Sequence, residues 1–193
     1  MRTIALLAYL FTSQITFSQV ALLPSSESQK IDITKYTLQN RKSLYPFNKA
    51  TQIKLVSFGE QHDSGSVRHQ VKFELPKSND TICIAKLDQI KELSWKQVDT
   101  LTDILYNTCS RWTIIEKSEM GCYFPRNAVV FFDKLNKPFE YIEICFECHG
   151  IKYSNQEVVS TEACDRMYEE LQSFFRIQGL KTSATELLRK NSR

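Results

Sequence analysis

The stretch Asn127–Phe132 (NAVVFF) decides the fold of this chain. Its apolar residues do not alternate with polar ones, which is typical of a strand that is covered on both faces. A polar turn follows at 133–138 (DKLNKP), and then a second strand is expected at Glu140–Phe146 (EYIEICF). On this second strand one face would carry Ile142, Ile144 and Phe146, and the other Tyr141, Glu143 and Cys145. We therefore expect an antiparallel hairpin at the centre of a sheet.

The segment before this hairpin predicts further strands. Residues Val67–Leu75 alternate between apolar and polar side chains, which is the period of a strand with one buried face. Weaker candidates, Gln52–Phe58 and Thr81–Lys86, lie on either side of it and complete a meander. A fourth strand is expected at Trp112–Lys117, before the break at Gly121.

Two amphipathic helices are expected between and after these strands. The first begins after Ser94 as N-cap and the second after Thr161, ending at Gly179. Apolar residues recur at helical spacing in both: Trp95, Val98, Leu101, Leu105 and Cys109 in the first, and Cys164, Met167, Tyr168, Leu171, Phe174 and Phe175 in the second. About six strands in the order βββαβββα indicate the α+β class, with a mainly antiparallel sheet and helices packed on one face.

The first residues are typical of an export signal. Arg2 precedes the apolar run Ile4–Phe11, and small residues follow near Ser18. The run is too short for a transmembrane anchor, so we expect an exported, soluble protein that is periplasmic or secreted. The expected division is an export signal at 1–18, a polar linker or loosely ordered arm at 19–50, a single α+β domain at 51–180 and a C-terminal tail at 181–193.

Composition excludes some classes of function. The formal net charge of the 193 residues is only +3, too small to indicate a nucleic-acid partner. Phosphate-cradling loops are not expected either, because the chain has five glycines and no Walker A or dinucleotide fingerprint. The patterns of serine hydrolases and zinc proteases are also missing from the sequence. Catalysis is therefore the less favoured interpretation.

The six cysteines predict disulfides, because exported chains with an even number of cysteines usually pair them. All six are candidates: Cys83, Cys109, Cys122, Cys145, Cys148 and Cys164. Pairing Val130 near Ile142 in the hairpin would place Cys122 opposite residues 148–150, and so next to Cys148 or Cys145. Cys164 could then bond to the remaining one of these two, and Cys83 to Cys109.

Cys145, Cys148 and His149 spell C-x-x-C-H, the sequence to which haem c is attached. The same pair of thiols could instead form a reactive dithiol. A third interpretation is structural zinc, held by Cys122, Cys145 and Cys148 with either His149 or Cys164. The setting argues against haem and a dithiol, because the motif ends a strand and two glutamates, Glu143 and Glu147, would raise the thiol pKa values.

The leading hypothesis is therefore an exported, disulfide-stabilised protein that binds an unknown protein or small ligand and needs no cofactor. The alternative is an extracytoplasmic electron-transfer or thiol-redox protein. It would use Cys145, Cys148 and His149, with covalent haem c or a reactive dithiol.

Overall fold

The computed structural model describes residues 35–59, 61–62, 71–72, 74–112 and 121–183. The expected export signal, most of the two expected strands Val67–Leu75 and Trp112–Lys117, and the expected tail beyond residue 183 lie outside the described residues.

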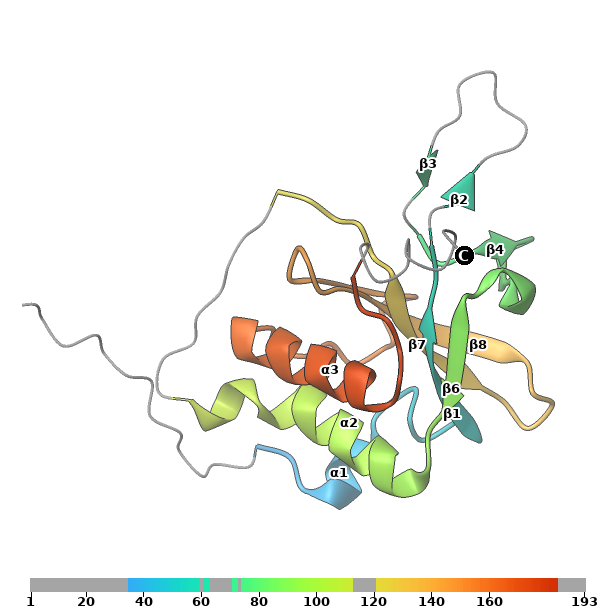
Figure 1. Cartoon of the computed structure of the whole chain (residues 1–193). Helices are drawn as coiled ribbons and strands as arrows, with labels where there is room; N and C mark the ends of the chain where they lie inside the picture. Colours follow the sequence, from blue (N-terminus) through green and yellow to red (C-terminus); the bar gives the residue numbers. More distant parts are fainter. Residues whose placement is uncertain (1–34, 60, 63–70, 73, 113–120, 184–193) are drawn as a thin grey trace, which may run out of the picture.

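A five-stranded antiparallel sheet forms the centre of the described part, in the order β6-β1-β7-β8-β9 (Figure 1). Its strands are β1 (Gln52–Ser57), β6 (Gln89–Glu92), β7 (Asn127–Phe132), β8 (Pro138–Cys145) and β9 (Gly150–Tyr153). Four shorter strands form two small sheets, β2 (Gln61–His62) with β3 (Val71–Lys72), and β4 (Lys77–Ser78) with β5 (Thr81–Ile82). The helices are α1 (Leu38–Ser43), α2 (Trp95–Asn107) and α3 (Asp165–Ile177), with 3-10 turns η1 (Ile84–Lys86) and η2 (Cys109–Arg111). The expected α+β class with a mainly antiparallel sheet is confirmed.

The β7–β8 hairpin forms where the sequence predicts it. All six residues of β7 are buried, as expected for a strand with neighbours on both sides and cover on both faces. In the turn, Asn136 has φ 57°, and the Asp133 carboxylate accepts hydrogen bonds from the backbone N–H groups of Leu135 and Lys137. The register differs by one residue from the expected one, because Val129 pairs with Ile142 and a β-bulge lies at Phe131/Phe132.

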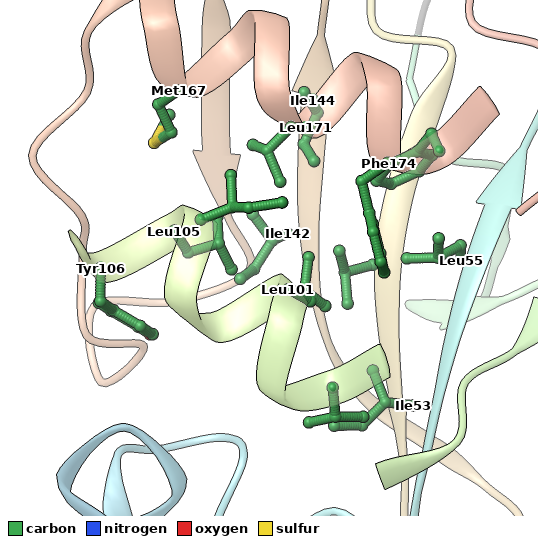
Figure 2. Close-up of a cluster of buried hydrophobic side chains, with 14 of the residues drawn as sticks. Ile53, Leu55, Leu101, Leu105, Tyr106, Ile142, Ile144, Met167, Leu171 and Phe174 are labelled. Atoms are coloured by element: carbon green, nitrogen blue, oxygen red, sulfur yellow. The ribbon is translucent and has the colours of Figure 1, made fainter. Parts of the chain in front are cut away.

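Helices α2 and α3 cover one face of the sheet (Figure 1). Figure 2 shows side chains of both helices, among them Leu101 of α2 and Leu171 and Phe174 of α3, directed toward sheet residues such as Leu55, Ile142 and Ile144. Removing these side chains from water supplies most of the drive for folding, about 1.5–3 kcal/mol for each fully buried one.

Both helices were predicted, with differences at their ends. Ser94 caps α2 through a capping box with Gln97, as expected. The N-cap of α3 is Cys164 rather than Thr161, whose backbone N–H instead donates to the Tyr153 hydroxyl. Gly179 has φ 84° just after the end of α3, the left-handed conformation expected there.

The opposite face of the sheet carries a second apolar cluster: Val56, Phe58, Leu75, Ile82, Ala128, Val130 and Phe132. Leu75 and Ile82 bring the β4–β5 segment against the sheet. The strand expected at Thr81–Lys86 is shorter than predicted, because only Thr81–Ile82 pairs and η1 follows. The β4–β5 segment therefore packs on the face that no described helix covers.

Residues 35–50 pack against the domain, although they belong to the stretch expected as a polar linker or loosely ordered arm. Phe47 and Ala50 are part of the helix-side core, and the Phe47 ring meets Phe131 edge-on at 5.0 Å. Arg41 of α1 is buried and donates to Asp99 and to the Thr102 hydroxyl. Sequence periodicity does not reveal such a segment, because a few isolated anchors hold it.

The buried Arg41 belongs to a charged cluster centred on Asp103. Arg41 Nη1 lies 3.2 Å from Asp103 Oδ1, and Arg111 Nη2 lies 2.6 Å from Oδ2. Burial by itself would raise the pKa of Asp103, but hydrogen bonds from Arg111 and Asn107 and the charge of Arg41 outweigh it. The pKa of this carboxyl therefore lies below its ordinary value, so the cluster stabilises the fold above that ordinary value and weakens as the pH falls through the folded-state pKa.

We expect Asp103→Asn to lower the free energy of unfolding by about 1–3 kcal/mol near neutral pH, since hydrogen bonds to charged groups are lost. The difference from wild type should shrink in acid, because protonation of the Asp103 carboxyl, which begins in the unfolded chain, removes the stabilisation. Urea unfolding at about pH 7 and about pH 3 measures both values. A difference that stays constant with pH would contradict the assignment of the stabilisation to the Asp103 charge.

Candidate functional site

The C-x-x-C-H motif lies on the β8–β9 hairpin. Cys145 ends β8 and pairs with Gly150 of β9, and residues 146–149 form the turn between them. His149 has φ 47°, which closes the turn. A Cβ atom on Gly150 would come within 2.7 Å of the Tyr123 ring, so the tight approach of residues 121–126 to this hairpin requires a glycine there.

Two disulfides form, one of them at this hairpin. Cys122 bonds to Cys148 with a Cα–Cα distance of 5.7 Å, so it joins one of its two expected partners. Cys109 bonds to Cys164, while Cys83 and Cys145 are free thiols. The pairing of Cys83 with Cys109, and that of Cys164 with a cysteine of the motif, do not occur. The end of α2 and the start of α3 lie together instead, because these two helices are antiparallel neighbours (Figure 1).

The free thiol of Cys145 is buried beside the disulfide. Its residue is only 1% exposed, and Sγ accepts a hydrogen bond from the backbone N–H of Phe124 at 3.4 Å. Burial raises the pKa of this thiol, and the charge of Glu147 adds to the rise, whereas backbone hydrogen bonds from Phe124, Cys148 and Glu147 oppose it. Cys145 is therefore mostly protonated at neutral pH.

His149 is held against the start of α3. Its Nδ1 lies 2.8 Å from Asp165 Oδ1, and its ring stacks on Tyr168 with a centroid distance of 5.0 Å and an interplanar angle of 7°. The side chain is 22% exposed. These contacts dock the hairpin turn onto α3.

The arrangement does not fit covalent haem or a zinc centre in this disulfide state. Haem attachment uses both thiols of the motif, yet Cys148 Sγ is bonded to Cys122 and Cys145 is buried. Zinc requires free thiolates, and two of the three nearby cysteines bond to each other. Within the described part of the chain, no three or more His, Cys, Asp or Glu side chains are grouped so that they could hold a metal ion.

Two buried polar groups lie on the same face of the sheet as Cys145. The Glu143 carboxylate accepts a hydrogen bond from the backbone N–H of Leu75, and burial raises its pKa. The buried Tyr123 hydroxyl has no hydrogen-bond partner among the described residues, and burial raises its pKa as well.

A pocket of about 240 Å³ lies elsewhere, where α2 begins beside the edge of the sheet. It is lined by Thr51, Gln52, Ile53, Glu92, Leu93, Ser94, Trp95 and Val98. Trp95 is 58% exposed, although the helical period places it on the buried stripe. The reason is its position as the first residue of α2, beyond the end of the core. An aromatic residue directly after an N-cap is the signal that sequence reasoning missed.

The neighbouring strand β6 is an edge of the five-stranded sheet. The backbone N–H of Leu93 donates to the carbonyl oxygen of Ile53 at 2.9 Å. Along an antiparallel strand every second residue directs its N–H and C=O groups at the neighbouring strand, here β1. The backbone groups of Ile90 and Glu92 therefore point away from β1. The Ile90 side chain is 45% exposed on this edge.

No helix in the described part of the chain is both long enough and apolar enough to span a membrane. Comparisons with protein-family models, with curated proteins and with solved structures found no match to this chain. By its fold and its cysteine bonds, the chain is a disulfide-stabilised α+β protein.

Proposed function

We propose that this chain is an exported binding module that takes up an extended segment of a partner polypeptide along β6. The observation that carries the proposal is that β6, an edge strand with no further neighbour among the described strands, leads into a pocket beside an exposed tryptophan. The two disulfides support an oxidising compartment, either the periplasm or the exterior of the cell.

The edge supplies the binding energy in this mode. An added strand would hydrogen-bond to the outward backbone groups of Ile90 and Glu92, and every peptide can make such bonds. Unprotected edge strands pair readily with other chains, and charged side chains and short length limit such pairing. Strand β6 has both, because it is only four residues long and carries Lys91 and Glu92. This favours a short bound segment over an extended pairing of sheets.

The pocket supplies the selectivity. It adjoins the end of β6 at Glu92 and Leu93, so one side chain of a bound segment would enter it beside Trp95. Aromatic side chains give large contact area at a low cost in conformational entropy, and they are common at the centres of interfaces. Trp95 is therefore the residue whose surroundings change most on binding.

The test uses Trp95 as its own reporter. The chain has two tryptophans, so Trp112→Phe leaves Trp95 as the only one. Short peptides selected from a random library for binding to the protein should shift the emission of Trp95 in this variant. Selected peptides that leave the emission unchanged would contradict the proposed position of the site.

The strand-addition mode makes a separate prediction for Ile90→Pro. Proline removes the outward N–H without breaking a bond to β1, so the fold should persist while peptide affinity falls about tenfold or more. Ile90→Val keeps the N–H and serves as the matched control, with affinity close to that of the parent. Equal affinities for the proline and valine variants, measured by titration of Trp95 emission, would exclude strand addition.

A further inference from the structure

We propose that Cys122, Cys145 and Cys148 form a thiol–disulfide exchange site, in which Cys145 attacks Cys148 and releases Cys122 to react with an external disulfide. This activity is independent of peptide binding at β6, because the two regions share no residue.

The position of the Cys145 sulfur carries the inference. Its Sγ accepts a hydrogen bond at 3.4 Å from the backbone N–H of Phe124, two residues beyond Cys122, and the backbone N–H groups of Cys148 and Glu147 also act on it. The thiol therefore lies close to both segments that the disulfide joins, residues 122–124 and the hairpin turn. These backbone N–H groups offset part of the rise that burial causes in the pKa of the Cys145 thiol, and the attack proceeds through its small thiolate fraction.

The hairpin turn makes Cys148 the sulfur that is attacked. Cys145 and Cys148 are three positions apart across a tight turn, the spacing at which disulfide oxidoreductases close their own bond. Positions three apart in a turn bring their Cα atoms within the range that a disulfide spans. The spacing of the two residues in the hairpin turn is therefore compatible with a Cys145–Cys148 bond.

The step balances without any added oxidant. The Cys145 thiolate attacks Cys148 Sγ, a Cys145–Cys148 bond forms, and the Cys122–Cys148 bond breaks with its electron pair leaving on Cys122. Cys145 gives up its proton to water before the attack, and the Cys122 thiolate can take up a proton from water afterwards. One disulfide and one thiol are present before and after the step.

The exchange moves the free thiol toward the surface. Cys145 and Cys148 are buried, whereas Cys122 is half-buried and follows the exposed Gly121. The released Cys122 thiolate can attack a disulfide of a partner polypeptide or of a small molecule. That second step forms a mixed disulfide on Cys122 and releases the other half of the external disulfide as a thiol.

The experiment maps which sulfur reacts in the folded protein. The full chain with Cys83→Ala, which removes the other free thiol, is treated with N-ethylmaleimide under native conditions. It is then quenched with acid and digested with pepsin at low pH, so that the bonds do not rearrange. We expect the label on Cys122 and a bond between Cys145 and Cys148. A label on Cys145 with the Cys122–Cys148 bond intact would overturn the proposal, and so would an absence of label when the same protein reacts fully once unfolded.

A second variant separates exchange from simple opening of the disulfide. Cys145→Ala in the same background should lose the label on Cys122 completely and keep the Cys122–Cys148 bond. Equal labelling of Cys122 with and without Cys145 would show that Cys145 takes no part, and would overturn the proposal. Oxidised glutathione as the probe should give a mixed disulfide on the same residue, Cys122, and one on Cys145 would contradict the order of the steps.

Discussion

Replacing Cys109 and Cys164 together by alanine is expected to lower the free energy of unfolding by about 4 kcal/mol. The bond joins two positions that are 55 residues apart in sequence, and a cross-link that closes a loop of this length removes much of the conformational freedom of the unfolded chain. The loop that the bond closes contains β7, β8 and β9. The bond itself joins the end of α2 to the start of α3. Both cysteines are also buried in the helix-side core.

Urea unfolding of the double variant measures this change. The matched control is Cys83→Ala, which removes a half-buried free thiol and should alter the stability by no more than about 0.5 kcal/mol. If the double variant stays as stable as the control, the Cys109–Cys164 bond does not restrict the unfolded chain in the way proposed.

Phe131→Ala is expected to cost about 3–5 kcal/mol, the range for removing a large aromatic side chain from a core. Phe131 is fully buried on β7 and packs edge-on against Phe47 at an interplanar angle of 88°. Alanine would leave a cavity between the sheet and residues 35–50. Thermal or urea unfolding gives the value, and Leu135→Ala on the neighbouring turn is the control, because that side chain is 67% exposed.

A double-mutant cycle adds a test of the segment before residue 51. Phe47→Ala and Phe131→Ala should be coupled by about 0.5–1.5 kcal/mol, the usual strength of an aromatic pair. Additive effects of the two substitutions would contradict the packing of this segment on the central strand.

The central hairpin is the part of the fold that local sequence predicts best. The uninterrupted apolar run of Asn127–Phe132 indicates a strand covered on both faces, and the alternation in Glu140–Phe146 indicates which side chains share a face. The alternation does not reveal that Glu143 and Cys145 are buried as well. The two main helices are also predicted, since the spacing of their apolar residues and the cap at Ser94 are local signals.

The candidate sites were predicted less completely. The motif residues Cys145, Cys148 and His149 are visible in the sequence, but their roles depend on groups that are distant along the chain, such as Cys122 and Asp165. The pocket beside Trp95 was not predicted at all. It is built from three separate elements, β1, β6 and α2, whose approach no single stretch of sequence reports.

The sequence by itself determined the fold class, the faces of the central hairpin and the two amphipathic helices, because each depends on the period of neighbouring residues. Tertiary structure decided the disulfide pairing, the burial of Arg41 in its charged cluster and the one-residue register shift at the Phe131/Phe132 bulge. It also decided the burial of Cys145 and the hydrogen bond that its sulfur accepts from Phe124. These features depend on which distant surfaces come into contact, and that is settled only when the helices and the β4–β5 segment pack on opposite faces of the sheet.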